Sequence, residues 1–233
     1  MPDLSNFDLA AALTQTGCPL CRVLRQGELR DIASFAREGR FAPQARMRFL
    51  RAGGYCPRHA WLLHAFAAET RHGMVIVDLY ERLVTSDRNR IRELLDRFAK
   101  GRVRRGTQIM RRSGRCPACA EADARLGRKR VFLVELLREQ RALQAYLRSD
   151  GLCIPHLADV VDAAGRSDPA IARALLEDAD RRLRELAADL AEFDRKRDYR
   201  YSHEPKGKEQ LSWTRVVQLY GGEDFAELAH DRR

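Results

Sequence analysis

Two cysteine-containing motifs occur twice in this chain of 233 residues, and this repetition constrains the fold more than any other feature of the sequence. A Cys-Pro-x-Cys motif at residues 18–21 recurs 98 residues later at 116–119. A Cys-x-x-His motif at 56–59 recurs 97 residues later at 153–156, and the four motifs contain all six cysteines. Self-similarity at a nearly fixed offset is typical of a duplicated structural unit, so we expect two related halves.

The segments between the motifs predict helices. In the first half, apolar residues recur at helical spacing over 22–37 and 43–52, and the pattern ends at Gly53-Gly54. In the second half a helical pattern runs through 128–149 and ends at Gly151. Charged residues make up 33% of the chain and aromatic residues 7%, a mixture typical of amphipathic helices. The predicted fold class is all-α, with two pseudo-symmetric helical repeats, each with a Cys3His metal site, and a C-terminal helical tail.

A long helix is expected after each Cys-x-x-His motif. The second begins with an N-cap followed by a proline, Asp168-Pro169. A short helix over 210–220 should follow in a polar, aromatic tail, which we expect to dock on the helical body through its aromatic side chains. The predicted organisation is a first repeat at 1–99, a basic connector at 100–115, a second repeat at 116–196 and a docking tail at 197–233.

The motifs predict metal binding. Each half contributes three cysteines, an odd number that would leave one thiol unpaired in any set of disulfides within the half. One histidine completes the four ligands of a tetrahedral Cys3His zinc site. In Cys-x-x-His, a cysteine at the N-cap and a histidine three residues on share one face of a helix, where the helix dipole favours a thiolate. The predicted ligand sets are Cys18, Cys21, Cys56 and His59 in the first half, and Cys116, Cys119, Cys153 and His156 in the second.

Two Zn²⁺ ions are the predicted cofactors, and iron–sulfur clusters on the same ligands are the alternative. A catalytic pair of Cys56 as nucleophile and His59 as base would leave the other cysteines without a role, and four protein ligands leave no open position for a metal-bound water. The sequence therefore favours a non-enzymatic, zinc-stapled interaction protein. The alternatives are a redox or sensor protein using the same ligands, and an enzyme with a cleft between the repeats.

Positive charge is concentrated in one segment. The chain has a net charge of +10, and residues 100–115 contain seven basic residues and no acidic one. An anionic partner, nucleic acid or an acidic protein, should be drawn to this stretch, although a solvated linker could have the same composition. The candidate contact residues are Arg102, Arg104, Arg105, Arg111 and Arg112. No secretory signal or membrane-spanning segment is recognisable, so we expect a cytoplasmic protein without a membrane partner.

These motifs resemble those of an uncharacterised bacterial family of unknown function, DUF6062, whose members pair Cys-Pro-x-Cys with a later Gly-Phe-Cys-x-x-His-like motif and repeat both. The resemblance covers most of the chain, rests on 54–59, 151–156 and the two Cys-Pro-x-Cys motifs, and extends to Asp198-Tyr199-Arg200. The family carries a Pro-Trp-Gly-like element after this point, whereas Lys206 stands here in place of the tryptophan. The resemblance implies paired metal sites and no particular activity.

Overall fold

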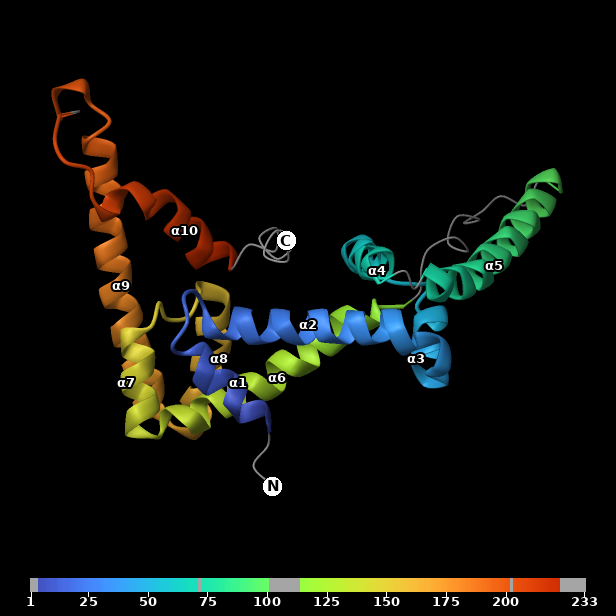
Figure 1. Ribbon diagram of the computed structural model, residues 1–233, viewed down its shortest axis with the longest axis horizontal. Helices are drawn as coiled ribbons and strands as arrows, with labels where there is room; N and C mark the ends of the chain where they lie inside the picture. The colour runs from blue at the N-terminus through green and yellow to red at the C-terminus, as the bar shows by residue number, and fades with distance from the viewer. Residues whose placement is uncertain (1–3, 71–72, 101–113, 202, 223–233) are drawn as a thin grey trace. The chain divides into compact units, whose positions relative to one another are not determined.

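The computed structural model describes residues 4–70, 73–100, 114–201 and 203–222, which form helices and contain no strand (Figure 1). The α-helices in chain order are α1 (Leu4–Ala12), α2 (Pro19–Glu38), α3 (Pro43–Arg51), α4 (Pro57–Glu69), α5 (Gly73–Ala99), α6 (Pro117–Leu137), α7 (Gln140–Arg148), α8 (Ile154–Ser167), α9 (Pro169–Arg195) and α10 (Ser212–Gly221). Short 3-10 helices lie at η1 (Gly39–Phe41), η3 (Tyr199–Tyr201) and η4 (Lys208–Leu211). The all-α prediction is confirmed, and none of the described helices combines the length and low charge needed to cross a bilayer.

Helix boundaries follow the local signals of the sequence. α2 and α3 correspond to the two helices predicted in the first half, and α6 and α7 form the helical pattern of the second. Pro169 is the first residue of α9, and the Asp168 carboxylate accepts a hydrogen bond from the Ile171 backbone N–H at 3.4 Å. This cap satisfies one of the donors that a helix start leaves open. α5 and α9, the long helices of the two halves, are both 27 residues long.

The helices cluster into two compact units that each take residues from both halves of the sequence. Unit 1 consists of residues 1–25 and 125–233, and unit 2 of residues 26–124. α2 therefore begins in unit 1 and ends in unit 2, whereas α6 begins in unit 2 and ends in unit 1. The two halves of the sequence thus exchange the first turns of these helices.

Each unit has its own apolar core, and both cores reflect this exchange. The core of unit 1 joins Leu9, Leu20 and Val23 from the N-terminal segment with Leu133 and Leu175 from the second half. The core of unit 2 is built from α2, α3, α4 and α5, and the start of α6 packs against it through Cys116 and Ala118. Burial of these side chains favours the exchanged arrangement of both segments.

The C-terminal tail docks on unit 1 through ion pairs. Lys196 Nζ lies 3.0 Å from Glu209 Oε1, and Arg215 Nη1 donates a hydrogen bond of 2.7 Å to Asp189 Oδ2. α10 packs against both α9 and α8. The expectation that the tail docks through its aromatic side chains is wrong for Tyr199, Trp213 and Tyr220, which are exposed. The Tyr201 ring does contact the helical body, because the Arg195 guanidinium of α9 lies 4.5 Å from its centroid. The ion pairs run in both directions, since Asp189 of α9 binds Arg215 of the tail and Glu209 of the tail binds Lys196.

Candidate metal centre

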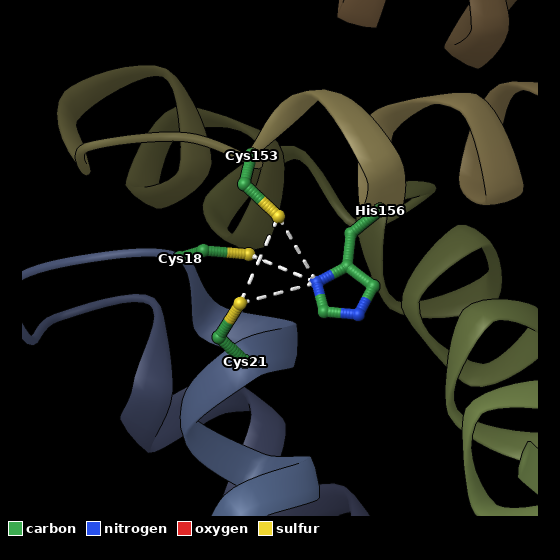
Figure 2. A group of neighbouring side chains, drawn as sticks. All are labelled: Cys18, Cys21, Cys153 and His156. Carbon is green, nitrogen blue, oxygen red and sulfur yellow. Dashed lines mark hydrogen bonds between the residues drawn. The ribbon is translucent and has the colours of Figure 1, made fainter. Parts of the chain in front are cut away.

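Four side chains converge in unit 1 to form the first candidate metal site, here called site I (Figure 2). Its members are Cys18, Cys21, Cys153 and His156. His156 Nδ1 lies 3.5 Å from the Cys18 sulfur, 3.3 Å from that of Cys21 and 3.2 Å from that of Cys153. The sulfurs of Cys21 and Cys153 are 3.7 Å apart, and all four ligand atoms lie within 4.8 Å of one another.

The second candidate site, site II, repeats this arrangement in unit 2. Its members are Cys56, His59, Cys116 and Cys119. His59 Nδ1 lies 3.1 Å from the Cys56 sulfur and 3.5 Å from the sulfurs of both Cys116 and Cys119. The sulfurs of Cys56 and Cys119 are 3.8 Å apart, well beyond the ~2.05 Å of a disulfide. Both groups are therefore free thiols that could hold a metal ion.

The predicted assignment of ligands to sites is wrong, because each site combines the Cys-Pro-x-Cys of one half with the Cys-x-x-His of the other. The lengths of the helices explain the exchange. At ~1.5 Å per residue, the 20 residues of α2 advance ~30 Å from the first motif, and the nine residues of α3 can return only ~14 Å. The Cys-x-x-His motif at 56–59 therefore stays beside the middle of α2, where His59 contacts Glu28. Glu28 lies ~10 Å along the helix from Cys21, too far for a shared ion.

A direct contact also supports the exchanged pairing in unit 1. The Gly17 backbone N–H donates a hydrogen bond of 2.7 Å to Asp150 Oδ2, across 133 residues of sequence. This bond ties the turn before Cys18 to the turn before Cys153. The ligand turns of site I are thus held together by protein groups that are not ligands.

Helix starts position one cysteine in each site. Cys56 and Cys153 are the N-cap residues of α4 and α8, both with extended backbones, and each histidine follows one turn later. Gly151, two residues before Cys153, has φ +77°, and a Cβ there would lie 2.9 Å from Arg182 Nε. Glycine thus allows the tight turn that leads into the helix start. The same signal, Gly-x-Cys, precedes α4 at residues 54–56.

These N-cap cysteines are the more acidic thiols. Hydrogen bonds from the Cys18 and Cys21 thiols, with the backbone N–H of His156, lower the pKa of Cys153. Burial raises the pKa of Cys56, but the backbone N–H and the ring of His59 beside its sulfur outweigh this effect and lower the pKa to about 7. By contrast, burial together with neighbouring thiols raises the pKa of Cys119 to about 12. One thiol in each site is therefore ready to bind a cation as a thiolate.

A buried carboxylate orients the histidine of site II. His59 is 1% exposed, and its Nε2 is hydrogen-bonded to Glu28 Oε1. Arg58 Nη2 donates to the other oxygen, Glu28 Oε2, at 2.5 Å. The bond to Glu28 raises the pKa of His59 to about 9. In the neutral ring that binds a metal, the same bond keeps the proton on Nε2 and leaves the lone pair of Nδ1 directed toward the three sulfurs. Metal-ligating histidines commonly have such a carboxylate partner, which fixes the ring and increases its basicity.

Site I lacks this support. Cys21 and Cys119 are equivalent positions of the two Cys-Pro-x-Cys motifs, so the residues seven positions after them are also equivalent. The first of these is Glu28, whereas the second is Leu126, which packs against the core of unit 1. Within the part of the chain that the structure describes, no carboxylate is hydrogen-bonded to His156. Sequence reasoning missed Glu28, although the signal was present: it interrupts an apolar helical face at Leu20, Leu24 and Ile32.

A cavity of about 300 Å³ adjoins site I and is lined in part by Cys18 and Cys153. Two arginines also line it, and both already have carboxylate partners: Arg182 pairs with Asp178, and Arg215 with Asp189. The positive charges of these two arginines beside the cysteines are therefore balanced by carboxylates of the protein itself. The predicted partner-binding residues Arg102, Arg104, Arg105, Arg111 and Arg112 lie outside the described residues, and their role stays a prediction.

Comparison with known proteins identifies a family. The sequence model of a family described as "Family of unknown function (DUF6062)" matches residues 6–227, nearly the whole chain. Searches of curated proteins and of solved structures gave no match. The match covers all eight side chains of sites I and II together with Glu28 and most of the tail. The chain therefore belongs to the DUF6062 family, a family of unknown function.

Proposed function

We propose that this protein is a non-enzymatic interaction module in which two Zn²⁺ ions, one in each site, staple the exchanged helices together. The spacing of the ligand atoms carries the proposal. A tetrahedral zinc ion with Zn–S of ~2.3 Å and Zn–N of ~2.0 Å requires S···S edges of ~3.8 Å and S···N edges of ~3.5 Å. One sulfur–sulfur distance is 3.7 Å in site I and one is 3.8 Å in site II, and the sulfur–nitrogen distances range from 3.1 to 3.5 Å. All ligand atoms of a site lie within 4.8 Å of one another.

This spacing favours a single ion over a cluster. In an iron–sulfur cluster, ligands bind different irons and are spread around a larger core than one ion. Ligand atoms within 4.8 Å of one another fit a mononuclear site better. Four protein ligands also complete the tetrahedron, so the bound ion would lack the open position that catalytic zinc keeps for water. These features support a structural role for the metal and a function that depends on the surface of the fold.

Metal analysis of anaerobically purified protein tests the proposal. We expect about two zinc ions per chain, a colourless protein, and an X-ray absorption spectrum with three sulfurs and one nitrogen around each ion. Iron with visible absorption bands would instead support the redox or sensor alternative. Less than one equivalent of any metal in folded protein would refute the metal sites themselves.

Paired substitutions test the exchanged pairing. Cys56→Ser with Cys116→Ser removes two ligands from site II alone, so one zinc ion should remain after dialysis against a chelator. Cys18→Ser with Cys56→Ser removes one ligand from each site and should leave neither ion tightly bound. If the ligands were paired within each half, the two double variants would give the opposite result. The test thus separates the two pairings by zinc content.

The partner is the second part of the proposal, and it rests on the basic segment at 100–115. Seven basic residues without an acidic one favour an anionic surface, either nucleic acid or an acidic protein. If the partner is nucleic acid, replacing four of the five candidate arginines with Gln should flatten the dependence of log affinity on log salt by roughly three units. A fluorescence titration at ~50 mM salt showing no binding to single- or double-stranded oligonucleotides would exclude nucleic acid. The metal sites would be unaffected by that result.

A further inference from the structure

The long helix α5 carries a second apolar stripe, on the face turned away from the core of unit 2. Val75, Leu79 and Leu83 are buried in that core. The side chains of the outer stripe are 41–63% exposed. They are Met74, Val77, Val84, Ile91, Leu95 and Phe98.

The outer stripe has the spacing of a coiled-coil seam. Taken together with Glu81 and Arg88, its positions follow one another at alternating intervals of three and four residues from 74 to 98. This is the a and d pattern of a heptad repeat, in which each helix inserts its side chains between those of a facing helix. The first set of heptad positions is apolar throughout and consists of Val77, Val84, Ile91 and Phe98. The second set consists of Met74, Glu81, Arg88 and Leu95, so its two middle positions are charged.

The equivalent long helix of the second half is contacted by the C-terminal tail of this chain. α9 has the same length as α5, and η4 and α10 pack along it. Leu186 is buried there, and Asp189 pairs with Arg215 of α10. The six side chains of the stripe on α5 remain exposed among the described residues of unit 2.

We propose that the outer stripe of α5 binds the same stripe of a second copy of this chain, as an antiparallel helix pair. The two polar positions decide the orientation. In a parallel pair in register, Glu81 would face the partner's Glu81 and Arg88 the partner's Arg88, and like charges in such layers are destabilising. An antiparallel pair avoids both repulsions.

The antiparallel register follows from the apolar positions. With position 86 on the twofold axis, Met74 lies opposite the partner's Phe98, and Val77 opposite the partner's Leu95. Glu81 then lies only three residues, ~4.5 Å along the axis, from the level of the partner's Arg88. The twofold axis generates two such ion pairs near the centre, with apolar layers at both ends, as a closed isologous interface requires.

The seam spans ~36 Å, so association should be modest. A single pair of helices of this length forms an interface at the small end of the range for specific complexes, and a Kd in the micromolar range is expected. Sedimentation velocity on the zinc-loaded full chain, from ~1 to ~200 µM, should show a reversible monomer–dimer equilibrium. A monomer at every concentration would overturn the proposal.

Three variants locate the interface and fix its orientation. Leu95→Asp removes an apolar contact twice per dimer and should weaken association more than ~100-fold. Glu81→Lys replaces two attractions with two repulsions and should weaken it ~10-fold, while adding Arg88→Glu to this variant should restore the original Kd. Because a parallel pair would keep like charges opposed in all these charge variants, an unchanged Kd for Glu81→Lys would refute the antiparallel register.

The control is Glu93→Lys, the same charge change on the opposite side of α5. Glu93 pairs with Arg97 within the helix, so only a small loss of stability is expected. Its Kd for dimerisation should equal that of the wild type. Since all these side chains are exposed in the monomer, each variant should keep its zinc and its helical content. A dimer that persists in Leu95→Asp would show that another surface is responsible and would overturn the proposal.

Discussion

Replacing Glu28 with Gln should weaken metal binding at site II and leave site I unchanged. The Glu28 side chain is 7% exposed and contacts both His59 and Arg58. Gln keeps the shape and one hydrogen-bond acceptor but removes the charge that makes His59 a stronger ligand. Loss of such a partner typically lowers metal affinity 10–100-fold, equivalent to ~1.4–2.7 kcal/mol.

A chelator titration followed by absorbance should release the two ions in separate steps in the wild-type protein, with site II releasing its ion last. The Cys18→Ser/Cys21→Ser variant, which retains only site II, assigns the steps. In Glu28→Gln the late step should move toward the early one by 10–100-fold in free chelator. The control is Glu177→Gln on α9, an exposed residue whose ion pair with the exposed Arg173 is screened by solvent and contributes little to stability. Equal shifts of both steps, or none, would refute the assigned role of Glu28.

Three further predictions concern stability in unit 1. Gly151→Ala should destabilise the zinc-loaded protein by ~1–2 kcal/mol in urea unfolding, because the φ of +77° at this residue disfavours a Cβ. The control is Gly165→Ala in α8, where a Cβ meets nothing within 4 Å, and it should stabilise the protein by up to ~1 kcal/mol. Leu175→Ala should cost ~2–5 kcal/mol because the side chain is fully buried, and its exposed neighbour Leu176→Ala should cost less than ~0.5 kcal/mol. The tail should detach in acid. The Gly207 backbone N–H and the Lys196 ammonium lower the pKa of Glu209 to about 2. Docking is therefore favoured above the unfolded-state pKa of ~4.3 and is lost as the pH falls toward 2. Faster hydrogen exchange in α10 would report this, and Glu209→Gln should reproduce it at pH 7 with both zinc ions bound.

Local features of the fold could be predicted from the sequence because their causes are local. Periodicity and caps placed α2, α3 and α9, and the Cys-x-x-His spacing placed a cysteine at the start of α4 and α8. The eight metal-binding candidates are the same eight that the structure brings together. Each of these predictions depends on interactions within a few residues of the chain.

The pairing of ligands could not be predicted in this way, because it depends on how far α2 carries the chain before α3 returns. Spacing in sequence was treated as proximity in space, and a helix of 20 residues breaks that relation. The docking of the tail was mispredicted for a related reason. Aromatic residues suggested an apolar interface, but whether an aromatic ring is buried depends on the surface it meets, and Asp189 and Lys196 of the helical body present charge there.

The exchange of ligands between the halves sets an order for completing the protein during synthesis. The ligands of site II span 57 to 63 residues between motifs, whereas those of site I span 132 to 138. Cys18 and Cys21 therefore leave the ribosome first and acquire their partners last. The longer loop adds only ~0.7 kcal/mol to the entropy of closure, so the delay arises from the length of chain still to be made.

During that interval the two N-terminal thiols are exposed to oxidants and competing metals. A nascent chain stopped anywhere before residue 153 has no means of closing site I, while one that has passed residue 119 can already close site II. Complete metal coordination by Cys18 and Cys21 thus requires that Cys153 and His156 have been synthesised. A metal ion held by all four ligands of site I would therefore mark a molecule whose chain has been made at least as far as residue 156.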